Sequence, residues 1–445
     1  MDRKSTERNA IKKSEYSEMF KTPENKIHPT HFEKHEVINW SSLSVKPLTS
    51  AVVTEDKKKK TKTVRYELPG GVDLLTATTL YYVLPARKIK RDFAKNYRFA
   101  WVEYHGFKIT PRATCGTKFT TFHNKTTTSS LFLSNYFLEK GFRDEYYKEI
   151  GNASEITDFS TEKPEHEITC LEMWTFSLDS GKAVPLFLYP EDVKPTLTYD
   201  FNLNVNKLIL IQKYDEDKDQ WINIPVTEEI TKQIFEGEDE IVEPVLYGEF
   251  VDITNKERKA RSMDRTFHIT DVFEVSRKNS KKPGKVVHLS LKHPGLTTAV
   301  MWGAENVSFD EQNYSKIYSD LHPTQGIGSS PFQHSSITQG DEKNYVFEEL
   351  PPSLVSSIFI NRHFSSPPHI KSLQGWSFVR SHESGIFYGG CFTKGCDTVL
   401  SCKLKESSSN TKYMVTACSI IIRRITVNAD GRIEFPLEKG KEEKK

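Results

Sequence analysis

The alternation of apolar and polar side chains predicts a chain built mainly of β-strands. The clearest case is residues 197–206, where every second residue is apolar and the residues between are Thr, Asp or Asn. A period of two places each kind of side chain on its own face, so we expect a half-buried strand. Further strands are expected at residues 78–84, 97–109 (one strand, or a hairpin with Gly106 at its turn), 207–213, 221–226, 286–291, 297–302, 356–360, 374–379, 398–403, 413–427 and 433–435. Residues 303–354 have little pattern and are expected to form a long loop with a functional surface.

One segment follows a helical period instead. Apolar residues recur near helical spacing between residues 129 and 151, with Ser129 or Ser130 as N-cap and Gly151 as the stop. Gly141 is expected to divide this segment into two short helices. Many short strands, few helices and no regular βαβ alternation predict an all-β chain of two sandwiches with short helical insertions.

The middle of the chain predicts a boundary between the two units. Residues 245–253 are expected to form a strand, and Thr254 with Glu257 fits a capping box for the basic helix that follows. We expect a second β-unit to open here. The predicted divisions are an N-terminal basic arm (1–62), two β-units (63–240 and 241–436) and a charged tail (437–445).

Charge distinguishes the arm from the rest of the chain. The 445 residues carry a formal net charge of +2, whereas residues 1–62 alone hold 14 Lys and Arg against 9 Asp and Glu, a net of +5. Their run Lys57–Lys60 is interpreted as a charged linker or as a contact with phosphates of DNA or lipid. Phe20, Ile38, Trp40 and Leu43 interrupt the polar pattern, so the arm either docks on a neighbour or is disordered.

Few segments of the chain have the pattern of a catalytic or binding site. The chain has no P-loop, G-x-G-x-x-G, H-E-x-x-H or G-x-S-x-G motif, so we expect no enzyme and assign no catalytic, cofactor-binding or metal-binding residue. Three clusters have ligand-like spacing, but each is interpreted as structural or solvated. They are His28, His31 and His35 with Glu33 and Glu36; Cys391, Cys396 and Cys402 with His382; and Asp215, Asp217 and Asp219. Trp101, Trp174, Trp302 and Trp376 are expected in the sandwich cores.

Two further patterns bear on location. No apolar run approaches the roughly 18 residues of a membrane helix, and the first residues lack the apolar core of a signal peptide. Synthesis in the cytosol is therefore expected. The six cysteines, at a low density, are expected to be reduced thiols.

Seven segments, in order, resemble the double jelly-roll major capsid proteins of nucleo-cytoplasmic large DNA viruses, such as iridoviruses. They are TTLYYVLPA (78–86), GFRDEYYKEIGN (141–152), residues 174–202, residues 245–275, LKHPGLTTAVMWGAEN (291–306), residues 370–404 and residues 412–435. The chain departs from the family pattern at three places. Asp179-Ser180-Gly181 replaces Asn-Pro-Gly, Lys292 replaces the Asn before His-Pro, and Gly385 with Phe387-Tyr388 stands at the Pro-Ser-Gly region.

The resemblance implies two consecutive eight-stranded jelly rolls and a structural role in an icosahedral capsid. It implies pseudo-hexagonal capsomers that are homotrimers, contacts with neighbouring capsomers and with minor capsid and penton proteins, and no specific nucleic-acid ligand. The arm becomes a candidate contact with an internal membrane. The protein would be made and assembled in host cytoplasm and reside in the virion.

Two alternatives stay open. One is a double jelly-roll assembly scaffold, as in poxviruses, or a minor capsid protein. The other is a carbohydrate-binding or hydrolytic β-sandwich, which predicts a pair of carboxylates in a cleft.

Overall fold

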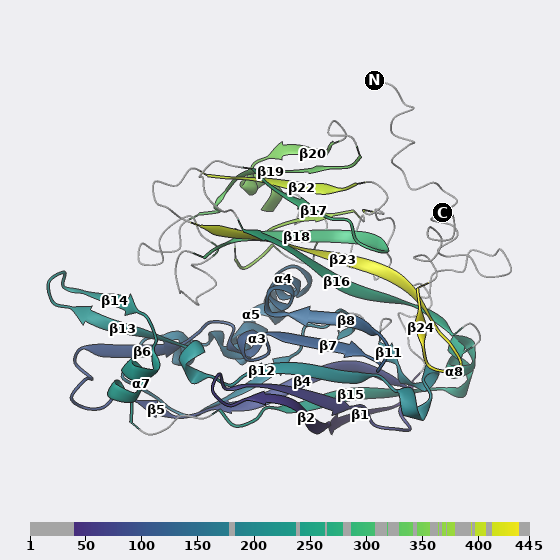
Figure 1. Ribbon diagram of the computed structural model, residues 1–445, viewed down its shortest axis with the longest axis horizontal. Coiled ribbons are helices and arrows are strands. Elements are labelled where there is room, and N and C mark those ends of the chain that lie inside the picture. Colours follow the sequence, from purple (N-terminus) through teal and green to yellow (C-terminus); the bar gives the residue numbers. More distant parts are fainter. Residues whose placement is uncertain are drawn as a thin grey trace.

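The computed structural model describes residues 40–177, 183–236, 241–262, 265–278, 286–307, 318, 329–340, 345–356, 364, 367–370, 372–378, 393, 397–405 and 412–435. Within these residues, two β-sandwiches lie one against the other, the first below the second in the view of Figure 1.

The first sandwich contains eight principal strands. They are β1 (Trp40–Pro47), β3 (Thr61–Glu67), β4 (Leu74–Leu84), β7 (Arg112–Gly116), β8 (Thr121–Thr126), β10 (His166–Leu171), β12 (Thr196–Asn202) and β15 (Val245–Ile253). One sheet has the order β1-β15-β4-β10, with β11 (Val184–Pro185) also on β4. The other has the order β2-β3-β12-β7-β8, in which β2 (Thr49–Asp56) is an additional edge strand.

Within the described residues, the second sandwich also contains eight principal strands. They are β16 (Thr266–Lys278), β17 (Val286–Ser290), β18 (Leu296–Asn306), β19 (Phe332–Thr338), β20 (Tyr345–Leu350), β21 (Gln374–Ser377), β22 (Val399–Leu404) and β23 (Tyr413–Val427). Its sheets have the orders β16-β23-β18-β21 and β17-β22-β19-β20, and β24 (Ile433–Glu434) pairs with β23.

The two sandwiches repeat one topology. Counting the principal strands of each unit from one to eight, the order in both units is 1-8-3-6 in one sheet and 2-7-4-5 in the other. All of these neighbours are antiparallel, and this arrangement defines the eight-stranded jelly roll. The prediction of two consecutive jelly rolls is therefore confirmed.

The strand pairing places the boundary between the two units after β15, later in the chain than the sequence predicted. β15 was expected to open the second unit, but it pairs with β1 and β4 and is the eighth strand of the first. Likewise, residues 40–62 were assigned to the arm, yet they form β1, β2 and the start of β3. An amphipathic pattern shows that a segment is a strand but not which sheet receives it, because pairing depends on distant partners. Thr254 does cap α8 (Asn255–Ser262), accepting a hydrogen bond from the Glu257 backbone at 3.3 Å.

The helical insertions lie between and beside the jelly rolls. α4 (Thr127–Phe137) and α5 (Lys140–Tyr147) occupy the predicted helical region, and α4 lies between the sheets of the two units (Figure 1). The N-cap is Thr126, whose hydroxyl accepts from Ser129, and the break falls at 138–139 rather than at Gly141. α6 (Ser154–Thr157), α7 (Glu228–Ile234) and α10 (Pro352–Leu354) are short.

Two other predictions were wrong. Only the first half of 97–109 is a strand, β6 (Tyr97–Trp101), because α3 (His105–Ile109) follows it. A Cβ on Gly106 of α3 would lie 2.9 Å from Cys170 Sγ, so close packing, not a turn, requires this glycine.

Residues 303–354, expected to form a long functional loop, contain β19 and β20. The strand expected at 356–360 lies outside the described residues beyond 356.

A small third sheet projects from the first jelly roll. Its order is β14-β13-β6, with β13 (Ile209–Asp215) and β14 (Gln220–Ile224) forming a hairpin that protrudes on the left of Figure 1. The short strands β5 (Arg87–Lys88) and β9 (Glu162–Lys163) pair nearby.

Candidate functional site

The N-terminal strap, defined as residues 40–56, runs along the lower edge of the first jelly roll (Figure 1). Its first half, β1, pairs with β15, and its second half, β2, pairs with β3, so the strap crosses from one sheet to the other at Leu48. Leu48 continues the first ladder by donating to Leu246 O at 2.9 Å. In the described sheets, β1 and β2 each pair on one side only and are therefore edge strands.

The strap presents apolar side chains to solvent. Leu43 and Val45 of β1 are 52% and 62% exposed, and Val52 and Val53 of β2 are also exposed. The edge position and the exposed apolar groups together mark a surface suited to contact another protein chain.

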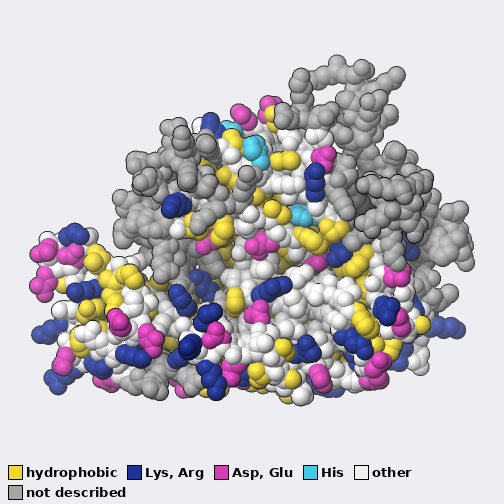
Figure 2. Space-filling model, in the orientation of Figure 1, with side chains coloured by type: hydrophobic (Ala, Val, Ile, Leu, Met, Phe, Trp, Pro, Cys, Tyr) yellow, Lys and Arg dark blue, Asp and Glu magenta, His cyan; other side chains and the backbone are white. Residues whose placement is uncertain are grey.

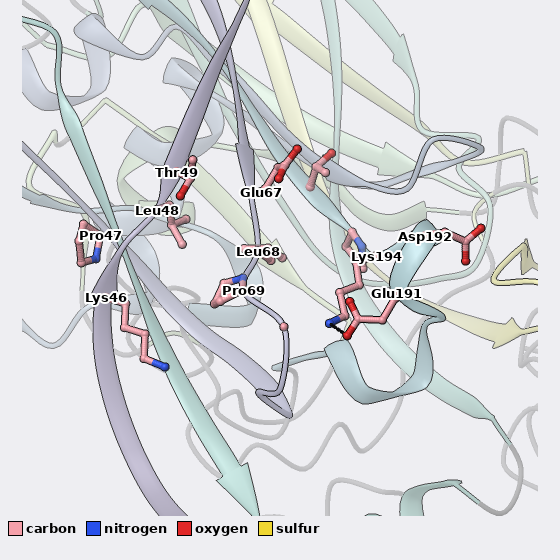
Figure 3. Close-up of a pocket in the computed structure, with 13 residues that line it drawn as sticks. Lys46, Pro47, Leu48, Thr49, Glu67, Leu68, Pro69, Glu191, Asp192 and Lys194 are labelled. Atoms are coloured by element: carbon pink, nitrogen blue, oxygen red, sulfur yellow. Dashed lines mark hydrogen bonds and ion pairs between the residues drawn. The ribbon is translucent and has the colours of Figure 1, made fainter.

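A pocket of about 500 Å³ opens beside the crossing point of the strap. Its walls come from residues 46–49 of the strap, residues 67–70 at the end of β3 and just after it, and residues 191, 192 and 194–196 before and at the start of β12 (Figure 3). Glu191 pairs with Lys194 at 2.9 Å, and Asp192 lies 3.8 Å from Lys118. Two of the three carboxylates that line the pocket, Glu191 and Asp192, thus have cationic partners and are largely exposed, so the pocket gives no specific support to the glycoside hydrolase alternative.

Charged side chains gather on two hairpin turns of the first unit. Lys57–Lys60 form the exposed turn between β2 and β3. This run is therefore part of the first jelly-roll unit and not of a linker that precedes it. Asp215, Asp217 and Asp219 form the tip of the β13–β14 hairpin, where Figure 2 shows acidic side chains gathered. Asp215 is half-buried, accepts from the Asp217 backbone and pairs with Lys218 at 3.2 Å, whereas residues 216–220 are exposed, as expected for a solvated tip.

A buried ion pair lies inside the first jelly roll. Lys125 of β8 binds Glu172, and their side chains are 1% and 0% exposed. The Lys125 ammonium also lies over the rings of Trp174 and Tyr199 at 5.8 and 5.5 Å. Burial lowers the pKa of Lys125 to about 7. The pair is enclosed by the core and has no route to a substrate, so we interpret it as structural.

Polar contacts also join the two jelly rolls. Asp271 of β16 accepts a hydrogen bond from the Asn124 backbone of β8 at 3.2 Å, and Glu274 accepts one from the Thr126 hydroxyl at 2.8 Å. Asn135 of α4 accepts from the Ile370 backbone at 3.1 Å. Apolar side chains from both units form one continuous core around these bonds, so the jelly rolls are fixed against each other.

The His and Cys clusters with ligand-like spacing lie largely outside the described part of the chain. His28, His31, His35, His382, Cys391 and Cys396 lie outside the described residues. Cys402 is buried in the second core, beside Ser335. Among the residues that the structure describes, no three His, Cys, Asp or Glu side chains gather as metal ligands. Trp101, Trp174 and Trp302 are buried and Trp376 packs on Phe347, so their interpretation as core residues is confirmed.

No helix in the described ranges is both long and apolar enough to span a membrane.

The fold is similar to that of viral capsid proteins, although the overall sequence identity is low. No protein-family model matches the chain, and no curated protein matches it. The PBCV-1 virus capsid protein superposes with a TM-score of 0.65 at 11% identity, covering 89% of this chain and 97% of that chain. The Faustovirus major capsid protein gives 0.64 at 6% identity, covering 87% and 91%. The mavirus major capsid protein gives 0.50 at 9% identity, covering 88% and 89%.

These comparisons define the class of fold. This chain is a double jelly-roll protein, with the architecture of the major capsid proteins of those viruses.

Proposed function

We propose that the protein is a structural capsid protein that forms pseudo-hexagonal trimeric capsomers of an icosahedral large DNA virus. The observation that carries this proposal is the repeated 1-8-3-6 and 2-7-4-5 strand order in two adjoining jelly rolls. Three such chains around a threefold axis present six similar sandwiches, and a unit of that shape packs with neighbours in a hexagonal layer. The match over 97% of the PBCV-1 capsid chain supports it.

The proposal also names the proteins that this chain would contact and its place in the virion. The partners are other copies in a homotrimer, neighbouring capsomers, and minor capsid and penton proteins. Residues 1–39 are proposed to face the inner side of the shell, towards an internal membrane or minor proteins. Assembly would take place in host cytoplasm. The proposed role is structural rather than enzymatic, and the similarity of the fold to capsid proteins supports it.

Electron micrographs of purified mature particles, with a protein gel of the same sample, test this proposal. A capsid protein stays abundant in mature icosahedral particles and accounts for their surface lattice. An assembly scaffold is present in immature particles and lost on maturation, which would favour the alternative role. Absence from both kinds of particle would contradict the proposal.

A further inference from the structure

The N-terminal strap has few side-chain anchors on its own jelly roll. Within residues 42–56, all described, Leu48 is the one buried side chain. Ser42 adds a hydrogen bond from its hydroxyl to Asp252 at 2.7 Å. The backbone ladders to β15 and β3 provide most of the remaining attachment. A segment with little buried apolar surface opens at low free energy compared with a core strand.

The pocket makes the attachment weaker where the strap changes sheets. Figure 3 shows Lys46, Pro47, Leu48 and Thr49 on one side of the opening and Glu191 and Lys194 on another. About 500 Å³ of space there separates the crossing point from residues 191–196. Apart from Leu48, the crossing therefore gains little packing that would hold it to one particular chain.

The turn after the strap is suited to be a hinge. Lys57, Lys58, Lys59 and Lys60 are all exposed in one tight hairpin turn, where like charges repel each other. Asp56 partly offsets this by accepting from the backbones of Lys58 and Lys59, both at 3.0 Å. Lys60 has a φ of 51°, a left-handed conformation that a lysine adopts at a cost. Straightening the turn would separate the charges and relieve this backbone.

We propose that the N-terminal strap is exchanged between copies of this chain. In the exchanged form, β1 and β2 of one copy lie beside β15 and β3 of the next, and Lys57–Lys60 is the extended hinge. A second copy is the occupant that fits, because it brings the same Leu48 and the same two ladder registers. Exchange of an identical element is a route to oligomers at low cost in free energy, and strained short hinges favour it.

The exchange rests on the proposed function, since an assembled shell holds copies in contact. In a threefold ring each chain would give its strap to the next chain and receive one from the previous chain.

Paired cysteines distinguish an exchanged strap from one that stays on its own chain. Ala51 of β2 lies opposite Arg65 of β3, and both are exposed, so Ala51→Cys with Arg65→Cys places two thiols side by side. The purified oligomer is oxidised and run on a denaturing gel without reductant. Exchange predicts that most oxidised chains migrate as covalent multimers, whereas a retained strap gives the mass of one chain.

A second cysteine pair on the strap and a control pair within one hairpin check this result. Ser42→Cys with Asp252→Cys links the same strap to β15 and must give the same answer, even if the first pair fails to fold. Gln212→Cys with Asn223→Cys links β13 to β14 within one hairpin and must give single chains in either case. Wild-type protein oxidised in parallel measures the background from the native cysteines.

Mass measured by light scattering before oxidation separates this inference from the proposed function. A trimer that yields covalent multimers supports both. A trimer that yields single chains overturns the exchange and leaves the capsomer intact. A monomer at micromolar concentration that yields single chains contradicts both.

Discussion

Lys125 and Glu172 form an ion pair in the interior of the first jelly roll, with side chains 1% and 0% exposed. Removing one partner leaves the other charge buried without compensation. We therefore expect Lys125→Ala to lower the free energy of unfolding of this unit by about 3–5 kcal/mol. The double variant Lys125→Met with Glu172→Leu removes both charges and is expected to recover most of that loss. Urea unfolding followed by fluorescence measures both.

The control is an exposed ion pair of similar chemistry. Lys232 and Glu228 of α7 lie 2.6 Å apart with side chains 75% and 72% exposed. Lys232→Ala should change stability by about 0.5 kcal/mol or less. If Lys125→Ala were equally mild, the buried pair would not contribute as described.

A second prediction concerns pH and the contact between the jelly rolls. Burial raises the pKa of Asp271 from 3.8 to about 7, opposed by hydrogen bonds from the Asn124 and Val272 backbones and by Arg423. Between these two pH values the folded state keeps a proton that the unfolded state has lost. The contribution of Asp271 to stability is therefore present below about pH 4 and is lost as pH rises towards 7.

The variant Asp271→Asn keeps a side-chain oxygen but does not titrate. We expect wild-type protein to lose stability relative to this variant as pH is raised from 4 to 8, measured by thermal unfolding at constant ionic strength. Parallel pH profiles of the two proteins would show that Asp271 is not titrating in this range.

A third prediction concerns the thiols. Cys115, Cys170, Cys402 and Cys418 are buried, and none of them is in a disulfide. Burial raises the pKa of Cys170 to about 11 and that of Cys402 to about 12. Because the thiolate is the reactive form, these four should react with thiol reagents only after unfolding. Neither chelator nor reductant should change the melting temperature. A fall of several degrees with chelator would favour a zinc site at Cys391, Cys396 and Cys402.

The sequence predicts strands well where one face is buried. β23 was placed at its observed bounds, because it is a long run of β-formers. β12 begins within one residue of its expected start, because apolar and polar residues alternate there, but it ends at Asn202 rather than at 206. The strap was missed for the opposite reason. Its strands are nearly all exposed, so WSSLSVKPLTSAVVTED has no period that distinguishes a strand from a polar arm.

Contacts between distant segments could not be predicted from local pattern. The place of β15 in the first unit depends on β1 and β4, and neither partner is encoded in residues 245–253 themselves. The pocket is assembled from residues 46–49, 67–70, 191, 192 and 194–196, which meet only in the folded chain. The two-unit architecture was predictable because it depends on the number of strands, and the resemblance supplied the jelly-roll order.

A fourth prediction concerns residues 1–39. Since β1 begins at Trp40, a deletion that tests the arm must end before it. We expect a chain without residues 1–39 to fold and to form trimers but to assemble poorly into particles. Gel filtration and electron microscopy measure the two steps. Normal particles from the shortened chain, or cleavage of this segment by protease added to intact virions, would contradict an inward-facing arm.

The mass of the purified full-length protein in solution tests the central claim most directly. Light scattering at micromolar concentration and physiological salt should give roughly three times the 51.2 kDa mass of one chain. A single species with the mass of one chain under those conditions would contradict the account of this protein as the subunit of a trimeric capsomer.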